Sequence, residues 1–462
     1  MNTETIVQNV WTRSKLLIKS MIIGILVLVL QIPAMFVRDV IAEREQRQQD
    51  AIAEVSSKWA GHQVLTGPVL VIPYWQSAPD SSARQVRTRE YAYFLPDKLD
   101  INANLTPQER HRGIYKVMLY SSEVTLSGSF SQPALQRLNI APADVIWNEV
   151  TIKLPVSDNK GLNEEIYMKL NDSSVAMTPQ TSADPAIDNA LQGDIPLTGP
   201  DDLKELRFSS SFVINGSQQI SFTPIGRNTT VNLASTWPHP SFIGDVLPQS
   251  SQVNTKGFKA SWKSAFHKHN FPQQWKGNAY SLSDYKYASG GNIQAMPIDV
   301  AKPTTVNNIN TASFGADLFV PVNGYQKTMR SIKYAALVIL LTFASFFLIE
   351  TTNKRSIHPF QYGLIGLALI LFYTLLLSFS EYISFNISYV IASLFTIGLI
   401  SWFVRGLLAS SRLTVFLSTI LVLLYVYVFT LLQLQDYSLL LGSIGLFITL
   451  ALIMHFSRKI QW

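Results

Sequence analysis

The sequence predicts an α-helical membrane bundle of six transmembrane helices that carries a large, mostly antiparallel, sandwich-like β domain. Three observations lead to this fold class. Charged residues make up 15% of the 462-residue chain, against about 25% in ordinary soluble proteins. Residues 331–462 contain 10 charged residues and a single proline. Twenty of the 22 prolines lie between Arg38 and Arg330. The chain therefore divides into 1–37, 38–330 and 331–462.

The formal net charge of +6 resides in the parts that flank the predicted spans. Residues 1–37 sum to +2 and residues 331–462 sum to +4, whereas residues 38–330 hold 27 basic and 27 acidic side chains. Basic residues beside spans follow the positive-inside rule. Binding to nucleic acid needs a basic patch on the water-facing domain, so nucleic acid is excluded as a partner.

The first span is predicted at 20–37, behind Arg13, Lys15 and Lys19. With residues 16–18 it approaches the roughly 20 apolar residues that cross the hydrocarbon core as a helix. A cleaved signal peptide is the alternative, but it needs a small-x-small site near Val37, which Ala34-Met-Phe-Val-Arg does not provide. We therefore predict an uncleaved anchor, followed by a helical stem at 39–59, where no glycine or proline occurs.

Five further spans are predicted in the C-terminal third, at 332–349, 361–380, 386–404, 413–433 and 437–456. With the N-terminus inside, the segments 350–360, 405–412 and 457–462 are cytoplasmic and carry six lysines and arginines, whereas the two short outer loops carry Glu381 and Asp436 and no lysine or arginine. This asymmetry indicates orientation. We expect both termini in the cytoplasm and residues 38–330 on the opposite side of the membrane.

Ionisable residues are expected only at the ends of the spans. Glu350 and Glu381 fall at opposite ends, where we expect water and headgroups to solvate them. Coupled transport usually needs a charge near the bilayer midplane, so the pattern disfavours a transporter. A polar cavity lined by the four residues Tyr373, Thr374, Ser378 and Thr396 would instead favour one.

The region between the first and second spans has the pattern of a β domain. Short runs rich in β-branched and aromatic residues are separated by Pro, Gly, Asn and Asp. Asn215-Gly216 lies between two runs as a hairpin signal, and the polar segment 171–200 predicts a long surface loop. The expected strands are 69–72, 91–95, 115–126, 145–154, 206–214, 219–222 and 229–233.

Motifs for catalysis or cofactor binding are missing from the sequence. The chain has no cysteine, which excludes thiolate catalysis and cysteine-ligated metals. His267 and His269 could face one side of a strand and bind zinc with Asp245 or Glu205 as a further ligand. We prefer a polar loop at this place, and we predict no metal, no cofactor and no catalytic residue.

The segment 237–242, Trp-Pro-His-Pro-Ser-Phe, is the candidate for a binding site. Two prolines restrict the backbone around His239, between the large aromatic side chains of Trp237 and Phe242. Such a rigid aromatic segment suits either a packed structural corner or the lip of a binding site. Both interpretations stay open, and Trp237, His239 and Phe242 are the predicted lip.

The layout of the chain resembles the CreD family of bacterial inner-membrane proteins, also called cell envelope integrity proteins. The resemblance runs from the first span to the last residues, and its most specific stretch is 236–248. It implies a protein that contributes to envelope integrity and to the response to β-lactams, with no agreed biochemical activity and no catalytic residues. The stretches that carry it are 65–73, 236–248, 257–262, 330–335, 358–362, 372–377 with Ser380-Glu381, and 439–442.

Together, the residues and the resemblance predict a non-enzymatic inner-membrane protein that binds envelope material or a partner protein. Its expected partners are the lipid bilayer and either an envelope protein or a peptidoglycan-related ligand. A transporter or transporter accessory subunit is one alternative. A periplasmic hydrolase of glycan or peptide is the other, and it would need two buried carboxylates that face each other across a cleft.

Overall fold

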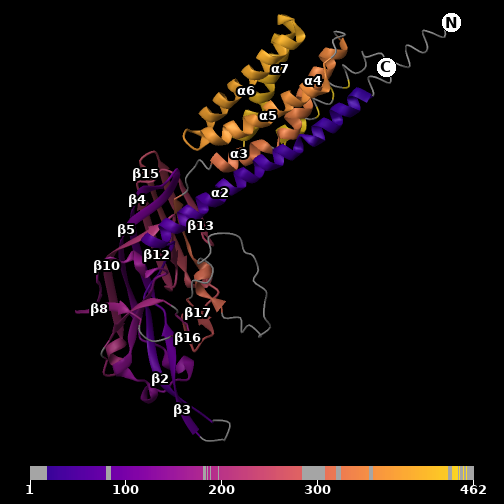
Figure 1. Ribbon diagram of the computed structural model, residues 1–462. Helices are drawn as coiled ribbons and strands as arrows, with labels where there is room; N and C mark the ends of the chain where they lie inside the picture. Colours follow the sequence, from indigo (N-terminus) through magenta and orange to yellow (C-terminus); the bar gives the residue numbers. More distant parts are fainter. Residues whose placement is uncertain are drawn as a thin grey trace, which may run out of the picture. The chain divides into compact units, whose positions relative to one another are not determined.

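A computed structural model gives the structure of the protein (Figure 1). It divides into two compact units, a helical unit of Met1–Gln49 with Val322–Trp462, and a β unit of Asp50–Pro321. Each unit is described by itself. The structure describes residues 18–79, 85–180, 184, 186–187, 189–195, 197–282, 307–318, 324–352, 357–434, 440–445, 447, 451 and 454.

In the described part of the chain, five helices are long and apolar enough to cross a membrane. The predicted sixth span, 437–456, falls largely outside the described residues. The other five predictions are confirmed as helices. They correspond to a helix over Ile18–Trp59 that includes α2 (Gln31–Trp59), and to α4 (Ala335–Thr352), α5 (Pro359–Ser380), α6 (Phe385–Leu408) and α7 (Ser411–Gln433).

The first helix, Ile18–Trp59, joins the predicted anchor and the predicted stem in one element of 42 residues. Its helical pattern is interrupted once, at Leu30. Pro33 follows within one turn, and it has no N–H to donate to the preceding turn of the helix. One stripe of this helix is buried, with Ile23, Leu30, Ala34 and Ile41 at helical spacing.

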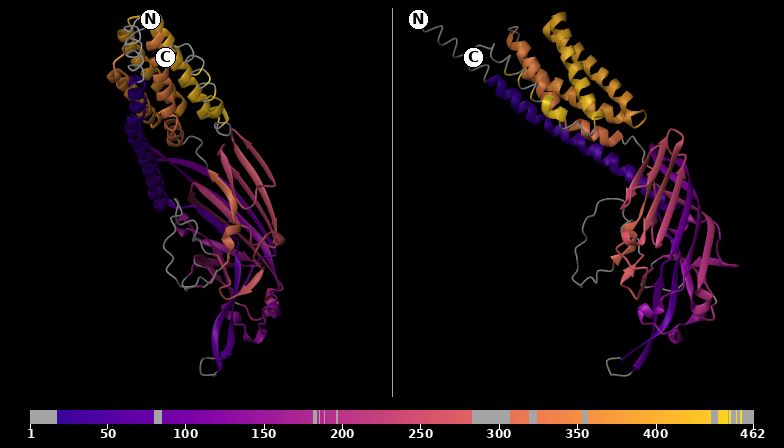
Figure 2. Two further views of the ribbon diagram at one scale, coloured as in Figure 1. Left: turned by 90° about the vertical axis from the view of Figure 1, so that its right-hand side faces the viewer. Right: turned by 180° about the vertical axis from the view of Figure 1, so that it is seen from behind.

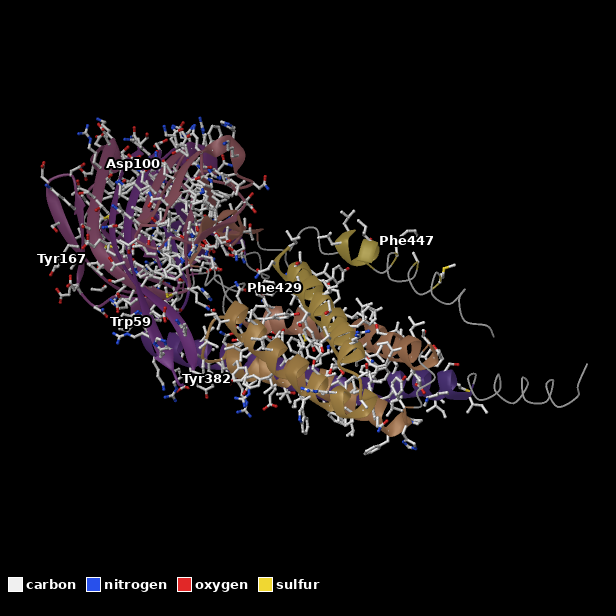
Figure 3. All side chains as sticks on the ribbon, turned by 90° about the horizontal axis from the view of Figure 1, so that it is seen from above. Trp59, Asp100, Tyr167, Tyr382, Phe429 and Phe447 are labelled. Carbon is white, nitrogen blue, oxygen red and sulfur yellow. The ribbon has the colours of Figure 1, made fainter. Side chains whose placement is uncertain are left out.

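A short helix, α3 (Gly324–Ile332), precedes the second span. The sequence forms a helix here because Tyr325, Thr328 and Ile332 fall on one face and are buried. Large apolar side chains cover the outside of the helical unit, and Phe447 and Tyr382 project from it at 73% and 77% exposure (Figure 3). A surface of this kind is suited to lipid.

In its described part, the β unit contains a sheet of thirteen strands, a sheet of four strands and one two-stranded pair. The thirteen-stranded order is β14 (Ser250–Asn254), β15 (Gly257–Ala265), β12 (Asn228–Ser235), β4 (Lys98–Arg112), β5 (Tyr115–Ser131), β10 (Glu205–Ser217), β7 (Ile166–Leu170), β8 (Ser173–Pro179), β9 (Ala190–Asp194), β6 (Thr151–Pro155), β2 (Val69–Pro79), β3 (Gln85–Phe94) and β16 (Gln274–Lys276). The four-stranded order is β1 (Gln63–Thr66), β11 (Gln219–Thr223), β19 (Phe314–Leu318) and β13 (Pro240–Gly244), and the pair is β17 (Tyr280–Ser281) with β18 (Asn307–Asn308).

The two large sheets share one hydrophobic core. Figure 2 shows their ribbons from two further sides. Trp262 of β15 stacks on Phe314 of β19 with ring centroids 5.4 Å apart, and Phe242 of β13 packs edge-on against Phe258 of β15 at 5.8 Å. Most strand pairs are antiparallel, and the described parallel pairs are β1 with β11, β4 with β12, and β17 with β18. The predicted β architecture is thus present, with a few parallel pairings.

The predicted hairpin at Asn215-Gly216 is wrong. Both residues lie inside β10, where they pair with Ser121 and Tyr120 of β5. A Cβ on Gly216 would lie 2.3 Å from the hydroxyl oxygen of Tyr120. A glycine is therefore needed here because the Tyr120 side chain lies close to the backbone of residue 216. The chain instead turns at Gln218, which has a φ of 60°, and β11 then joins the other sheet.

The predicted surface loop at 171–200 is also wrong in part, because it contains β8 and β9 and the buried residues Ala186 and Ile187. A fifteen-residue strand, β4, was missed. Its Asn, Asp and Pro residues are poor strand formers, but every second residue from Leu99 to Leu105 is buried. In this strand, the alternation of buried and exposed side chains therefore outweighs the low strand propensity of individual residues.

Candidate functional site

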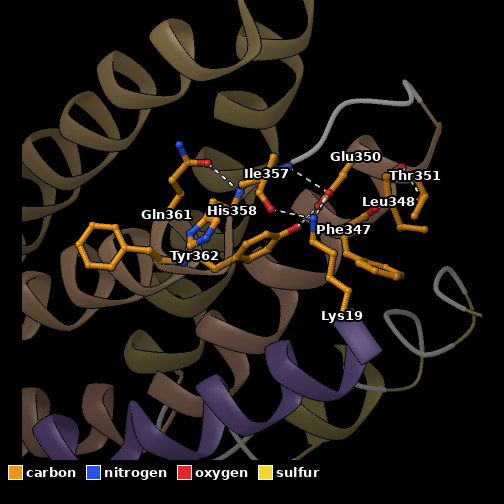
Figure 4. Close-up of polar contacts among 10 residues, drawn as sticks. Lys19, Phe347, Leu348, Glu350, Thr351, Ile357, His358, Gln361 and Tyr362 are labelled. Carbon is orange, nitrogen blue, oxygen red and sulfur yellow. Dashed lines mark hydrogen bonds and ion pairs between the residues drawn. The ribbon is translucent and has the colours of Figure 1, made fainter. Parts of the chain in front are cut away.

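A buried polar cluster lies at one end of the helical unit (Figure 4). Lys19 of the first helix forms an ion pair with Glu350, in the last turn of α4. The Lys19 ammonium also donates to the backbone oxygen of Ile357 at 2.7 Å. The Glu350 carboxylate accepts the Ile357 N–H at 3.0 Å and the Tyr362 hydroxyl at 2.9 Å. Only 8% of the Glu350 side chain is exposed.

The sequence around the start of α5 places Tyr362 against Glu350. His358 caps the helix, with its Nδ1 accepting from the Phe360 N–H at 3.2 Å, and the Gln361 side chain accepts from the His358 N–H at 2.9 Å. This reciprocal cap fixes the first turn of the helix. The Tyr362 ring is further held by edge-on contact with Phe343, at 5.4 Å between centroids.

A second polar contact joins the first helix to the other end of the same unit. Arg44 Nε lies 3.7 Å from the carboxylate of Glu381, which follows α5, and the Tyr325 hydroxyl of α3 donates to that carboxylate at 3.3 Å. Lys19 and Arg44 are 25 positions apart, or about 37 Å along a helix. A bilayer is about 30 Å thick in its hydrocarbon core and about 40–45 Å with headgroups, so the spacing of the two basic residues matches the thickness of a bilayer.

Between these two ends, the first helix packs in parallel along α5. A Cβ on Gly366 would lie 2.1 Å from a terminal methyl of Leu30, and one on Gly363 would lie 3.8 Å from a methyl of Leu26. Gly366 therefore lets the two helices approach closely, whereas a Cβ at Gly363 would make only an ordinary van der Waals contact. We call the ion pairs Lys19–Glu350 and Arg44–Glu381, with this glycine contact between them, the anchor clamp.

The expectation that Glu350 and Glu381 are solvated is wrong. Glu381 keeps 11% of its side chain exposed and Glu350 keeps 8%. Each acid finds a basic partner on the first helix, more than 300 residues away in the chain. The available sequence signal was the coincidence of a lysine and a glutamate at span ends on the same predicted side of the membrane.

The four side chains that would favour a transporter are not brought together. Tyr373 and Thr396 are buried, whereas Thr374 and Ser378 are exposed on another face of α5. The centre of the bundle is filled by rings, since Phe372 contacts the rings of Tyr373, Tyr389 and Tyr425 with centroids 4.8–5.3 Å apart.

The β unit has its own buried ion pair, which sequence reasoning missed. Lys153 Nζ of β6 lies 2.6 Å from one carboxylate oxygen of Asp184. The other oxygen accepts from the Tyr93 hydroxyl at 2.7 Å and from the backbone N–H groups of Ala186 and Ile187 at 2.9 and 3.2 Å. Burial and the Asp184 charge raise the pKa of Tyr93 well above its usual range. The pair thus fixes a loop onto β3 and β6.

The carboxylates of the β unit do not form a hydrolase site in its described part. Asp184 is the one fully buried carboxylate there, and its oxygens are already bound. Asp245 and Glu205, the acids considered from sequence as further zinc ligands, are exposed. Among the described residues, His, Asp and Glu form no group of three that could hold a metal ion.

His267 and His269 are not on one face of a strand. β15 ends at Ala265, and Phe266–Lys268 form a 3-10 turn. His267 is exposed, whereas the ring of His269 stacks on Phe271 at 4.9 Å. Burial lowers the pKa of His269, and the neighbouring charges of His267 and Lys268 lower it further. The preferred polar loop describes this place better than a zinc site.

Comparison with known proteins places the chain in a family. A family model described as "Inner membrane protein CreD" matches residues 15–462. The chain belongs to the CreD family. It is 32% identical over 441 residues to the inner membrane protein CreD of Escherichia coli (strain K12), with 94% of this chain and 91% of that protein covered. The resemblance stated from sequence is confirmed, and this CreD-family chain is an inner-membrane protein embedded in the lipid bilayer.

Two stretches that carried the CreD resemblance take part in the anchor clamp. Residues 358–362 supply the cap of α5 and the Tyr362 hydroxyl. Ser380-Glu381 supplies the carboxylate that meets Arg44. These sequence motifs of the CreD-family chain thus have a physical role in holding the first helix.

The structure places the predicted lip residues of this CreD-family chain at the start of an edge strand. Trp237 and Phe242 are half-buried and pack against the core, whereas His239 is exposed. The Trp237 indole N–H donates to the backbone oxygen of His239 at 3.0 Å, which fixes the bend between the two prolines. Phe242 packs edge-on against Trp262 at 5.7 Å. Part of the segment is therefore a structural corner, and its role as a lip stays a prediction.

Proposed function

We propose that this chain is a non-enzymatic protein of the bacterial cell envelope, with a membrane bundle that anchors and a β unit that binds. The observation that carries the proposal is the anchor clamp. Glu350 and Glu381, the glutamates at the ends of described spans, are both bound to the first helix. This helix continues past the boundary between the units to Trp59. A bundle whose buried acids hold a helix suits an anchor better than a conduit for ions.

The orientation in this proposal follows the charges of the short loops. The Lys19–Glu350 end of the clamp is placed in the cytoplasmic leaflet and the Arg44–Glu381 end at the periplasmic face, with both chain termini in the cytoplasm. The β unit then stands in the periplasm. There it contributes to envelope integrity and to the β-lactam response by binding an envelope protein or a peptidoglycan-related ligand.

Non-catalytic binding is favoured because the described part of the β unit offers no pair of facing buried carboxylates and no metal-binding group. A transporter subunit or a hydrolase would each need a feature that the described residues do not bring together. The predicted lip of Trp237, His239 and Phe242 is the proposed contact surface, with His239 as its exposed member.

Site-directed cross-linking in cells tests the proposal. Because the chain has no cysteine, His239→Cys gives one reactive position, and Tyr167→Cys, at a residue 51% exposed on β7, gives a matched control. A membrane-impermeant thiol reagent should label both from the periplasmic side. A cleavable cross-linker should then capture an envelope protein or a wall fragment at position 239 and not at 167.

Two results would contradict the proposal. Labelling of position 239 only after the inner membrane is opened would overturn the orientation. Capture of nothing specific at 239, together with a wild-type response of a deletion strain to β-lactams, would overturn the envelope role.

A further inference from the structure

One edge of the thirteen-stranded sheet is formed by β14, whose sequence is Ser-Ser-Gln-Val-Asn. All five residues are exposed. In the described part of the chain, β15 is its one strand neighbour, so its outer edge presents unpaired backbone groups. Edge strands are usually protected by charged residues, proline or a cover. This strand contains neither a charge nor a proline.

The two faces of β14 differ in chemistry. Val253 pairs with the core residue Phe258, so its side chain points to the core face of the sheet. It is nevertheless 51% exposed, and Leu247, in the loop before β14, is 73% exposed. Gln252 pairs with Lys259 and therefore points to the outer face. The edge thus has an apolar side and a polar side.

The outer face beside this edge carries positive charge. Lys259 and Lys263 alternate with the buried residues of β15 and are exposed. They lie four residues apart, or about 13 Å along the strand. The acid on the outer face of β4 two strands away, Asp100, is paired with Lys98 at 2.8 Å. Among the described residues, no acidic side chain forms an ion pair with Lys259 or Lys263.

We propose that β14 binds an extended segment of a partner protein as an added strand, and that this segment alternates acidic and apolar side chains. The unpaired backbone of the edge requires a polypeptide in strand form. The acidic side chains would face Lys259 and, where the segment extends past the Ser250–Ser261 pair, Lys263. The apolar side chains would cover Val253 and Leu247. This inference deepens the proposed function, because it names the class of partner that the β unit binds.

The geometry fits this occupant in reach as well as in charge. Strands in a sheet lie about 4.8 Å apart, so an added strand would lie about 10 Å from β15. A lysine side chain extends far enough to meet a glutamate across that gap. An apolar segment alone would leave both lysines without a partner, and a folded anion without an extended backbone would leave the edge unpaired.

A labelled peptide of alternating valine and glutamate, about eight residues long to cover the strand, provides the test. Fluorescence anisotropy with the full-length chain in detergent should show saturable binding that weakens as salt is raised. The double substitution Lys259→Glu with Lys263→Glu should weaken binding by about tenfold or more. Lys169→Glu, on the exposed face of β7 in the same sheet, should leave it unchanged.

Peptide variants separate strand addition from simple charge attraction. The same peptide with alternate backbone nitrogens methylated keeps its charge and cannot pair along that edge, so it should lose binding. Equal binding of the methylated peptide, or equal loss in the Lys169→Glu control, would overturn the proposal.

A cysteine at Gln252 tests the competing occupants. Formation of disulfide-linked dimers at that position would identify a second copy of the chain as the occupant and would overturn the proposal. If the peptide fails to bind while cross-linking at position 239 still captures an envelope component, the proposed function stands and this inference fails.

Discussion

Two buried ion pairs in the described part of the chain have the same chemistry and different surroundings. In the β unit, the side chains of Lys153 and Asp184 are 4% and 2% exposed. In the helical unit, those of Lys19 and Glu350 are 19% and 8% exposed. The first pair fixes a loop within one unit, whereas the second joins two helices whose paired residues are 331 positions apart. The more deeply buried pair, Lys153–Asp184, therefore acts within one unit, and the less buried pair, Lys19–Glu350, joins distant parts of the chain.

The difference in exposure decides how costly each broken pair should be. A fully buried charge that loses its partner has no access to water and remains uncompensated. Lys19 lies at the end of a span, where a lysine can extend its ammonium toward the interface. We therefore expect the β pair to be the more sensitive of the two.

The largest effect is expected from single substitutions in the β pair. Lys153→Met leaves the Asp184 carboxylate buried with only neutral donors, and should lower the free energy of unfolding of the β unit by about 3–5 kcal/mol. Urea unfolding of the full-length chain, followed by tryptophan fluorescence, measures it, since Trp275 stacks on Tyr93 at 5.2 Å. The double substitution Lys153→Met with Asp184→Leu should recover much of the loss. Equal loss in the double variant would show that the cost is not one of unpaired charge.

A smaller effect is expected from the membrane pair. Lys19→Met should weaken the attachment of the first helix by about 1.5–3 kcal/mol, which is typical for a hydrogen bond to a charged group. Cysteines at Leu26 and Gly363, whose positions are in contact, should form a cross-link less efficiently in this variant. Glu43→Gln, which removes an exposed pair with Arg47 on the same helix, is the control and should change little. An unchanged cross-link in Lys19→Met would contradict the anchor clamp.

The close approach of the first helix to α5 gives a third test. Gly366→Val would force side-chain atoms against Leu30, and Phe343 lies 3.0 Å from the Cβ position as well. Gly398→Val introduces the same residue on α6, where nothing lies within 4 Å. The two variants share the same helix propensity, so the difference in helical-unit stability should be about 1–3 kcal/mol from crowding alone. Thermal unfolding of the two variants in detergent, followed by the loss of helical structure, measures this difference in stability.

The smallest effect is a pH dependence confined to the β unit. Burial lowers the pKa of His62 below its usual 6.5, so the folded state binds fewer protons there than the unfolded state. Its contribution to stability is full above pH 6.5 and is lost as the pH falls toward the lowered pKa. In His62→Gln, the unfolding midpoint of the β unit should therefore fall less between neutral and mildly acidic pH than it does in the wild-type chain. An acid dependence identical to that of the wild-type chain would contradict this assignment.

Local patterns predicted five of the six spans, and each of the seven expected strands overlaps a strand of the structure, because length of apolar stretches and alternation are local properties. The remaining described strands were missed. The family resemblance was predictable for the same reason, since it rests on short ordered stretches. The burial of Glu350 was not predictable from its neighbours, because its partner Lys19 lies on another helix. The same holds for Asn215-Gly216, whose hairpin signal is outweighed by the close approach of Tyr120.

The candidate site shows the same division between local and long-range information. The rigid bend at 237–242 was visible in the sequence, since two prolines flank His239. The edge at β14 was not, because its four uncharged polar residues and one valine have no strand pattern of their own until β15 is placed beside them. Whether a strand is an edge depends on the whole order of the sheet.

The spacing of the two ion pairs in the anchor clamp has a consequence for the choice of membrane. Lys19 and Arg44 are held at a fixed separation along one helix, and each is tied to its own end of the α5 region. A bilayer thicker than this spacing would draw one charged pair into hydrocarbon, and a thinner one would be matched by tilt. Hydrophobic mismatch costs fractions of a kcal/mol per Å. The chain should thus respond to lipid acyl length, partitioning toward regions of the inner membrane whose thickness suits both pairs at once.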